Sequence, residues 1–379
     1  MSRIKVLYIC DVSIIGGSTL SLIDMIDSLR EYVDPIVLVM KKGELYERLR
    51  LLDIECIVHP YYINTYGKNA IYRRPISYIK KLIEYTVFNK ICIKKIANLL
   101  SKSGIQIIHS NSSAVTIGQP LANILGCKHV WHLREFLDEF PYCNILLGRN
   151  NLKKRFMLSD GIITITSPIA RHWDIKEDNL HTSIWDAVCS KNDAILSNSK
   201  LKQFVVCSRY LSDFKGCDFA VEAFGKSKLY QNGYRLVFIG EYSESYKEKL
   251  NKIASAYHCN NHIDYLGFQK DVGKILANST AYLMVTELEG MGRVSVEAMF
   301  KGCLVIGRNS GGTADFVKNE ETGLLFKDVD ECAEIMRKVA IKYPFKIAQN
   351  AQSFAVENFS KERYGEKILI YYKKLLGAN

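Results

Sequence analysis

The feature that most constrains the fold is a regular alternation of short apolar runs with helical patterns. In the first part of the chain, apolar runs at 4–10, 35–40 and 55–59 alternate with helical patterns at 20–29 and 44–52. Parallel strands need long, usually helical crossovers, and this order is typical of them. The sequence therefore predicts an α/β fold built on a doubly wound parallel sheet.

The alternation restarts in the second half of the chain. Polar, aperiodic residues between Asp186 and Lys202 separate the first series from a second one, which opens with the apolar run at 203–208. A chain of 379 residues also exceeds the usual size of one hydrophobic core. We expect two Rossmann-like, doubly wound domains facing across a cleft. Their expected bounds are 1–188 for the first domain, 189–202 for a linker, 203–358 for the second domain, and 359–379 for a final helix that packs back toward the first.

Composition narrows the class of protein. The 48% of hydrophobic residues indicates a globular chain, and no apolar stretch approaches the roughly 20 residues that span a bilayer. The short apolar run at the N-terminus is unlike a signal peptide, and eleven cysteines without a CxxC pair suit free thiols, so we expect a cytoplasmic protein. The net charge of +11 favours an anionic partner.

Two carboxylates, Glu289 and Glu297, flank a glycine-rich turn after the apolar run at 281–285. A helical pattern follows at 294–300, and a helix N-terminus attracts anions through its unpaired N–H groups and its dipole. Helical side chains lean toward the N-terminus, so Glu297 can reach a ligand at this turn. The motif suits a phosphate flanked by hydroxyl groups, as in a nucleotide diphosphate sugar; a surface carboxylate pair around an ordinary turn is the alternative.

Two cations, Arg209 and Lys215, follow the run at 203–208 that opens the second domain. They should lie at the carboxyl edge of its sheet, where open α/β folds bind ligands. An arginine fork and a lysine point charge can together neutralise a diphosphate. The alternative is a pair of solvated surface cations.

In their order along the chain, these motifs resemble the family 4 retaining glycosyltransferases, which have the GT-B architecture. The resemblance is strong over about residues 203–327 and weaker before them. The residues that carry it are Arg209, Lys215-Gly216, Glu289-Gly-Met-Gly, Glu297-Ala-Met, Gly311-Gly312 and Gly323-Leu-Leu.

The resemblance implies a role for each of these side chains. Glu297 would hold the ribose hydroxyls of the nucleotide, and Glu289 would contact the transferred sugar. Arg209 and Lys215 would bind the diphosphate. The other implied donor contacts are the backbone amides of Gly292, Arg293 and Val294 and the loops at Gly240 and Phe268.

In the first domain the resemblance is looser. Gly16 and Gly17 match a glycine loop that lies close to the donor phosphate and the acceptor. His132 follows a strand where the family places a histidine that contacts the donor sugar, and His109, at the end of the previous strand, is the alternative. A histidine at a strand end is also commonly a packed core residue, and we assign neither as a general base.

No metal or other cofactor is expected. Asp328 and Asp330 have the spacing of a metal-binding D-x-D motif, but they precede a helical pattern, so capping of that helix is the favoured role. The nucleotide diphosphate sugar, with UDP or GDP as its nucleotide, would act as a co-substrate.

A basic segment between Lys68 and Lys102 has a single acid, Glu84. Apolar residues recur between its cations at approximately helical spacing, which is typical of a helix on an anionic membrane surface. An ordinary helix with a solvated basic face is the alternative, whereas nucleic-acid binding is disfavoured because no recognised motif accompanies the charge. The candidate membrane or acceptor contacts are Arg73, Arg74, Lys80, Lys81, Lys94 and Lys95.

These observations predict a retaining, metal-independent glycosyltransferase at the inner face of a membrane. Its acceptor would be a glycan or a lipid-linked glycan in cell-surface polysaccharide synthesis. Two alternatives remain open, namely a nucleotide-sugar epimerase on the same fold and a catalytically silent binding module recruited to membranes.

Overall fold

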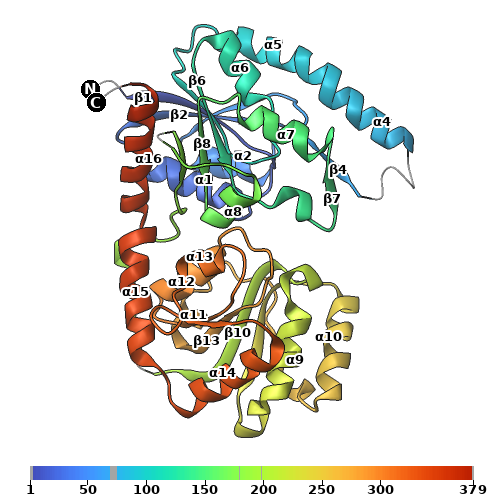
Figure 1. Ribbon diagram of the computed structural model, residues 1–379, viewed down its shortest axis with the longest axis vertical. Helices are drawn as coiled ribbons and strands as arrows, with labels where there is room; N and C mark the ends of the chain where they lie inside the picture. Colours follow the sequence, from blue (N-terminus) through green and yellow to red (C-terminus); the bar gives the residue numbers. More distant parts are fainter. Residues whose placement is uncertain (1–2, 69–74, 179, 198, 378–379) are drawn as a thin grey trace. The chain divides into compact units, whose positions relative to one another are not determined.

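The computed structural model describes residues 3–68, 75–178, 180–197 and 199–377. The chain forms two compact units (Figure 1). The first unit comprises residues 1–187 and 361–379, and the second comprises residues 188–360. The last helix, α16 (Lys361–Leu375), is thus part of the first unit although it follows the whole of the second in sequence.

The segment predicted as a linker, 189–202, belongs to the second unit. Ile195 donates its backbone N–H to the Phe300 carbonyl oxygen at 3.0 Å. Lys200 Nζ donates to the carbonyl oxygens of Ala277 and Gly302 at 2.7 and 2.8 Å. The expectation of a separate linker was wrong because the segment is hydrogen-bonded to the backbone of the second unit and β10 already begins at Leu201, although many of its side chains are exposed.

Within the described residues, the sheet of the first unit has seven parallel strands in the order β3-β2-β1-β5-β6-β8-β9. The strands are β1 (Ile4–Ile9), β2 (Val33–Val39), β3 (Glu55–Val58), β5 (Ile107–Ser110), β6 (Lys128–Leu133), β8 (Gly161–Thr164) and β9 (His181–Ser183). A small antiparallel pair, β4 (Thr65–Gly67) and β7 (Cys143–Ile145), lies outside this sheet.

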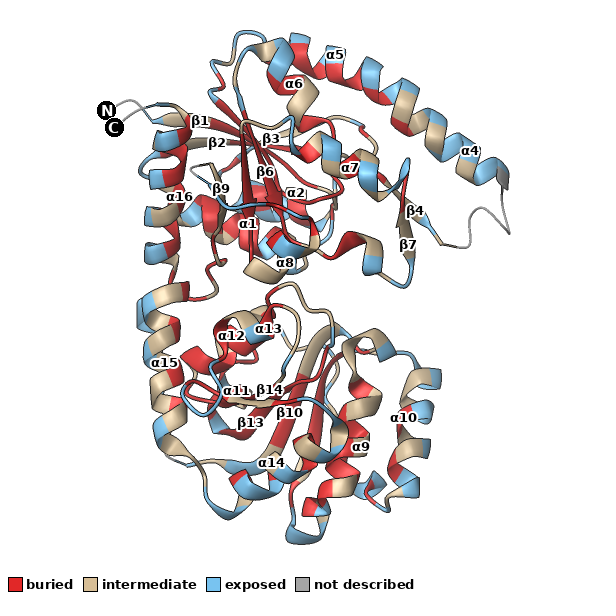
Figure 2. Ribbon diagram, viewed as in Figure 1, coloured by how far each residue is buried: buried red, intermediate tan, exposed pale blue. Residues whose placement is uncertain are grey.

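Helices cover both faces of the first sheet, whose strands are largely buried (Figure 2). Val6 and Tyr8 of β1 belong to a core cluster with α1, α2 and α16, and Leu7 and Ile9 to another with α5 and α6. This alternation along β1 is what a sheet covered on both faces requires. The helices are α1 (Gly17–Ser28), α2 (Glu44–Leu51), α4 (Pro75–Ile83), α5 (Asn89–Leu100), α6 (Gly118–Leu125), α7 (Gly148–Phe156), α8 (Ser167–His172) and α16; a π-helical turn (Glu84–Phe88) joins α4 to α5.

The sheet of the second unit has six parallel strands among the residues that the structure describes, in the order β12-β11-β10-β13-β14-β15. The strands are β10 (Leu201–Tyr210), β11 (Arg235–Glu241), β12 (Ile263–Tyr265), β13 (Ser279–Met284), β14 (Leu304–Arg308) and β15 (Leu324–Phe326). The helices are α9 (Cys217–Ser227), α10 (Glu244–Ala256), α11 (Gly273–Asn278), α12 (Arg293–Phe300), α13 (Thr313–Phe316), α14 (Val329–Ile341) and α15 (Phe345–Phe359).

Helix α15 was not predicted from the sequence. Its buried face consists mainly of small side chains, at Ala348, Ala351 and Ala355. Alanine adds little to a hydrophobic pattern, so this face gives a weak periodic signal even though it packs closely against α12.

Both sheets are doubly wound, as predicted. In the first, the chain builds β1, β2 and β3 outward on one side and then returns to place β5 on the other side of β1. In the second, it builds β10, β11 and β12 and then places β13 on the other side of β10. Loops diverge at such a switch point, so the carboxyl ends of β1/β5 and of β10/β13 are the expected ligand sites of the two units.

Two expectations from composition can be compared with the structure. Each of the eleven cysteines, all of them described, is a free thiol; Cys10 and Cys303 are fully buried, whereas Cys207, in a similar apolar run, is only partly buried. Within the described ranges, every helix is too short or too polar to cross a bilayer.

Candidate functional site

An ion pair links the carboxyl ends of the two switch-point strands of the second unit. Lys215 ends a short 3-10 turn (Asp213–Lys215) after β10, and Glu289 lies in the loop after β13. Lys215 Nζ donates to Glu289 Oε2 at 2.8 Å, and the two side chains are 30% and 22% exposed. Both charges therefore reach the surface of this unit, where the lysine can also contact an anion.

Two glycines shape the loop that carries Glu289. Gly292 directly precedes the first residue of α12 and has a φ of +82°, a backbone angle that residues other than glycine rarely adopt. Gly312, from the loop after β14, packs so closely that a Cβ there would lie 2.0 Å from the Gly290 carbonyl oxygen. The Gly312 N–H donates to the Glu289 carbonyl oxygen at 2.7 Å, so the two loops form one preorganised surface.

The N-terminus of α12 and Glu297 complete this surface. The first-turn amides of a helix have no partner within the helix, so those of Arg293 and Val294 suit the predicted role of binding an anion. Burial raises the pKa of Glu297, and the positive charges of Arg293 and Lys301 oppose that rise.

The charges of Glu289 and Glu297 both affect the pKa of one buried residue of β13, Tyr282. Burial raises the pKa of Tyr282 well above its usual value, and the negative charges of Glu289 and Glu297 add to that rise. The structure thus brings both carboxylates of the motif close to the carboxyl half of β13.

Arg209 lies at the end of β10 beside an exposed aromatic side chain. The centre of its guanidinium is 5.8 Å from the Phe268 ring and 5.6 Å from the Tyr210 ring, within cation–π range. Phe268, 54% exposed, follows β12, and Gly240 donates its N–H to the Gly267 carbonyl oxygen at 2.9 Å. The loops predicted to contact the donor, at Gly240 and Phe268, therefore adjoin the predicted phosphate-binding arginine.

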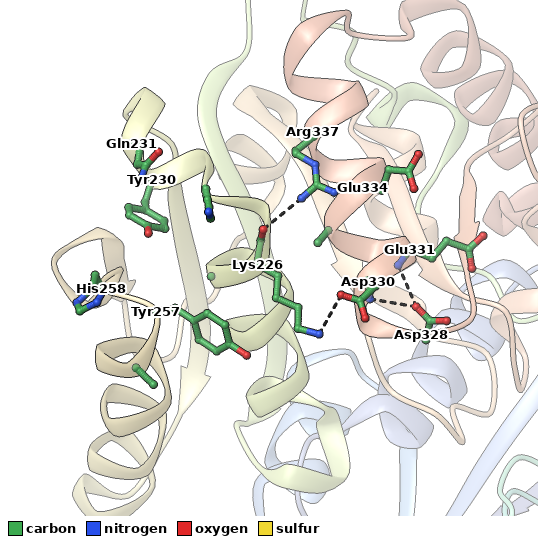
Figure 3. A pocket seen from close by; sticks show the side chains of 14 residues that line it. Lys226, Tyr230, Gln231, Tyr257, His258, Asp328, Asp330, Glu331, Glu334 and Arg337 are labelled. Atoms are coloured by element: carbon green, nitrogen blue, oxygen red, sulfur yellow. Dashed lines mark hydrogen bonds and ion pairs between the residues drawn. The ribbon is translucent and has the colours of Figure 1, made fainter.

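A separate open hollow of about 880 Å³ lies between α9, α14 and the end of α10 (Figure 3). Its lining includes an ion pair between Lys226 Nζ and Asp330 Oδ1 at 2.9 Å. None of the predicted donor-binding residues contributes to it. The hollow therefore lies apart from the predicted donor-binding residues, which are at the carboxyl edge of the second sheet.

Asp328 has the predicted capping role. Its Oδ1 accepts hydrogen bonds from the N–H groups of Asp330 and Glu331 at 3.0 and 2.9 Å. One carboxylate of the D-x-D sequence is therefore engaged in starting α14.

In the first unit, the glycine loop leads directly into α1. Gly16 precedes the helix with extended backbone, and its N–H donates to Thr19 Oγ1 at 2.8 Å. A Cβ at Gly16 would meet no atom within 4 Å, and Gly17 is exposed, so a ligand has room to approach this backbone.

The two candidate histidines are packed together inside the first unit. His132 and His109 are 0% exposed, and His109 Nε2 lies 3.1 Å from His132 Nδ1. His109 Nδ1 lies 2.7 Å from the hydroxyl of Tyr372 on α16. Burial lowers the pKa of both imidazoles well below the usual range, and the Arg134 charge adds to this, so both rings are neutral.

His132 lies inside β6, and its ring neighbours His109, which in turn contacts Tyr372 of α16. Its Nε2 is buried and forms no hydrogen bond among the described residues. The predicted contact of His132 with a donor sugar stays a prediction.

Sequence reasoning missed the charged centre of this buried network. Arg134, 4% exposed, forms an ion pair with Asp186 and donates from Nε to Asn111 Oδ1 at 3.0 Å. The Tyr364 hydroxyl of α16 donates to Asp186 Oδ1 at 3.2 Å. A signal was present, because Arg134 and Glu135 directly follow β6, and Arg209 has a similar place at the end of β10.

The basic segment forms α4, the π-helical turn and α5. Lys80 and Lys81 on α4, and Lys94 and Lys95 on α5, are exposed. The predicted contacts Arg73 and Arg74 lie outside the described residues. Large apolar side chains are also exposed along this segment, with exposed fractions from 45% to 82%, at Ile76, Ile79, Ile83, Val87, Phe88 and Ile91.

The chain is similar in part to known glycosyltransferases. Residues 190–353, less than half of the chain, match the family model of glycosyl transferases group 1. An uncharacterized glycosyltransferase of Methanocaldococcus jannaschii is 26% identical over 289 residues, which is 74% of this chain and 77% of that protein. The glycogen synthase of Thermodesulfovibrio yellowstonii is 28% identical over 171 residues, 43% of this chain and only 33% of the relative's length.

Solved structures extend the similarity to almost the whole chain. The crystal structure of Anabaena HepE in complex with UDP has a TM-score of 0.79 and 19% identity, covering 97% of this chain and 99% of that one. At that identity the likeness establishes the fold alone. The chain thus has the GT-B fold, with two Rossmann-like units, as the sequence predicted.

Proposed function

We propose that the protein is a glycosyltransferase that moves a sugar from a nucleotide diphosphate sugar to a hydroxyl acceptor with retention of configuration. The observation that carries this proposal is the Lys215–Glu289 ion pair at the switch point of the second unit, with Arg209 on the adjacent strand. The family match over residues 190–353 includes all of these residues and supports it.

The chemical role of the cations follows from where charge develops. As the bond from the sugar to the diphosphate breaks, negative charge grows on the leaving phosphate. Arg209, Lys215 and the N-terminus of α12 are fixed in place before the reaction and can stabilise this charge without reorganising. Because they supply the neutralisation that a metal ion supplies elsewhere, we propose transfer without a metal.

The two glutamates serve as ligand-holding groups in this proposal. Glu297 accepts hydrogen bonds from the ribose hydroxyls and Glu289 from the transferred sugar, and neither acts as a nucleophile. Phe268 and the backbone near Gly240 contact the base. UDP and GDP are the favoured nucleotides, and the complex of the similar HepE fold with UDP makes UDP the first to test.

A donor screen tests the proposal. A ligand that binds only the folded protein stabilises it by RT ln(1 + [L]/Kd), which is roughly 2.7 kcal/mol at 100 times Kd. UDP-, GDP- and ADP-sugars should therefore raise Tm selectively, and the stabilising donor should release nucleoside diphosphate slowly by hydrolysis. A protein that is stabilised by no nucleotide sugar would contradict the proposal.

We also propose that α4 and α5 lie on an anionic membrane surface at the cytoplasmic face, where the acceptor is a glycan or a lipid-linked glycan for cell-surface polysaccharides. Five exposed apolar side chains recur three or four residues apart and therefore follow one side of the segment, at Ile76, Ile79, Ile83, Val87 and Ile91, and Phe88 lies next to Val87. Exposed lysines flank this stripe, and each cation near an anionic leaflet contributes about 1 kcal/mol.

Vesicle flotation tests the membrane proposal. Wild-type protein should float with vesicles of phosphatidylcholine and phosphatidylserine more than with phosphatidylcholine alone. Lys94→Glu and Ile79→Asn should weaken this binding, whereas Lys252→Glu, at an exposed position on α10, should not. Equal losses in all three variants would argue against a specific surface.

A further inference from the structure

The glycine loop of the first unit, residues 10–17 between β1 and the start of α1, is held on one side by the first residues of α2. The Leu45 N–H donates to the Ser13 carbonyl oxygen at 3.1 Å. The Ile15 N–H donates to Glu44 Oε2 at 2.9 Å. The backbone directly before the two glycines is therefore fixed to a neighbouring helix.

One of these two contacts depends on a side chain that can be replaced. The contact between Leu45 and Ser13 joins backbone atoms, and it favours a glycine before α2, because a Cβ at Gly43 would lie 2.6 Å from the Ser13 carbonyl oxygen. The contact with Ile15 depends on the carboxylate of Glu44, which is exposed and lies in the first turn of α2. Replacing Glu44 should therefore release the loop at Ile15 without disturbing the protein core.

After the glycines, the chain is held by a buried side chain from the end of β5. Asn111, which is 0% exposed, directly follows β5, and its Nδ2 donates to the Ser18 carbonyl oxygen at 3.1 Å. Its Oδ1 accepts a hydrogen bond from Arg134 Nε at 3.0 Å, and Arg134 forms an ion pair with Asp186. Asn111 therefore connects the first turn of α1 to the buried network around Arg134.

These contacts flank the part of the loop that is open to a ligand. Ile15 comes directly before Gly16, and Ser18 directly after Gly17. A Cβ at Gly16 would meet no atom within 4 Å, and Gly17 is exposed. Glycine loses more conformational freedom on ordering than other residues, so contacts on both sides reduce the entropy that a ligand must overcome to order this backbone.

We propose that Glu44 and Asn111 are positioning residues that fix the glycine loop in the conformation used in the transfer reaction. They act through the backbone at Ile15 and Ser18, and the two glycines between these residues face the ligand. The inference rests on the proposed transferase function, because it assigns the loop a part in that reaction. A displaced loop misplaces the reacting groups, so it should slow the chemical step more than it weakens donor binding, which depends mainly on the second unit.

The kinetics of nucleoside diphosphate release from the donor test this role. Glu44→Ala removes the acceptor of the Ile15 N–H and should lower kcat by about tenfold, with the donor KM within about twofold of wild type. Glu44→Gln keeps an oxygen that can accept this hydrogen bond and should stay within about threefold of the wild-type kcat. The matched control is Glu47→Ala, which removes an exposed acid on the same helix that pairs with Arg50 and should leave kcat unchanged.

Amide hydrogen exchange measures the loop without any activity. In Glu44→Ala, protected amides of residues 11–20 should exchange about tenfold faster than in wild type, and Glu44→Gln should restore most of the protection. Asn111→Asp keeps an acceptor for Arg134 but replaces the N–H donor by an oxygen that faces the Ser18 carbonyl, so it should also speed exchange in this segment. Urea unfolding shows whether the buried Asn111→Asp variant folds, and the exposed Glu44 tests the inference independently of that result.

The two readouts separate this inference from the proposed function. If wild-type protein neither binds UDP nor releases nucleoside diphosphate, the proposed function is wrong, and exchange still decides whether Glu44 and Asn111 hold the loop. In an active protein, the inference is wrong if Glu44→Ala matches Glu47→Ala in both exchange and kcat. It is also wrong if exchange is faster while kcat is unchanged, or if the donor KM rises while kcat is unchanged, because Glu44 would then serve the fold or donor binding instead.

Discussion

The two units carry different charged groups at the same edge of the same topology. At the β10/β13 switch point of the second unit, Arg209 and Lys215 lie with Glu289 and a helix N-terminus. At the corresponding edge of the first unit, Asp11 follows β1 and Glu135 follows β6, and burial raises the pKa of both carboxyl groups. The two edges therefore share their topology and differ in a few side chains that follow the strands.

The supporting residues differ between the two edges as well. The second-unit edge is built from glycines that let loops approach closely, as at Gly312 and Gly292. The first-unit edge is held by a buried network in which α16 supplies Tyr364 and Tyr372 to Asp186 and His109. The last helix of the chain therefore supports the first-unit edge through residues that are far from it in sequence.

The largest effect should come from removing a cation of the second edge. Arg209→Ala or Lys215→Ala should lower kcat/KM by about 10²–10³, the usual cost of losing one preorganised group that stabilises transition-state charge. The rate of nucleoside diphosphate release from the donor measures this loss of kcat/KM. Lys226→Ala is the matched control, because Lys226 forms a similar ion pair with Asp330 away from the site. A Lys215→Ala protein as active as Lys226→Ala would remove the lysine from the mechanism.

Replacing a glycine by alanine should change the free energy of unfolding by different amounts at the two edges. Gly312→Ala places a Cβ against a backbone oxygen and should lower the free energy of unfolding by about 3 kcal/mol. Gly16→Ala meets open space in extended backbone and should change it by less than about 0.5 kcal/mol. Urea unfolding measures both. Similar values for the two variants would mean that the close packing of the Glu289 loop is not energetically important.

Because its pKa is raised, the carboxyl group of Glu135 should make the stability of the folded protein depend on pH. The folded-state pKa of Glu135, about 7, lies above its value of 4.5 in an unfolded chain, so the folded state holds the proton longer and loses stability as pH rises between these values. Relative to Glu135→Gln, wild-type protein should lose on the order of 2 kcal/mol between about pH 5 and about pH 8. Urea unfolding of both proteins across this range provides the test, and a difference that stays constant with pH would mean that the carboxyl group titrates normally.

The smallest of these effects should be at Glu297. Glu297→Gln keeps the shape of the side chain and loses its charge, so UDP affinity should fall by about tenfold. Pyrophosphate, which has no ribose, should bind both proteins equally. Calorimetric titration with each ligand makes the comparison, and an equal loss for pyrophosphate would assign Glu297 to the diphosphate instead.

The second edge was largely predictable from the sequence because its residues are close together along the chain or directly follow strands. Arg209 and Lys215 come after one apolar run, and Glu289 and Glu297 flank one turn. Each of these residues could be placed at the sheet edge from local patterns alone.

The first edge was not predictable in the same way. Its buried network joins His109, Arg134, Asp186 and Tyr372, which only the folded chain brings together. The surroundings of His132 could not be predicted from its place in a strand, because its neighbour His109 is in contact with Tyr372 of α16, the last helix of the chain. The linker was misplaced for a related reason, since polar residues such as Lys200 can satisfy distant carbonyl groups.

The most direct test of the account is calorimetric titration of UDP and GDP into the wild-type, Lys215→Ala and Lys226→Ala proteins. We predict micromolar binding of at least one nucleotide to wild-type protein, a loss of about tenfold or more in Lys215→Ala, and unchanged binding in Lys226→Ala. This prediction is contradicted if neither nucleotide binds wild-type protein, or if Lys215→Ala binds as tightly as Lys226→Ala.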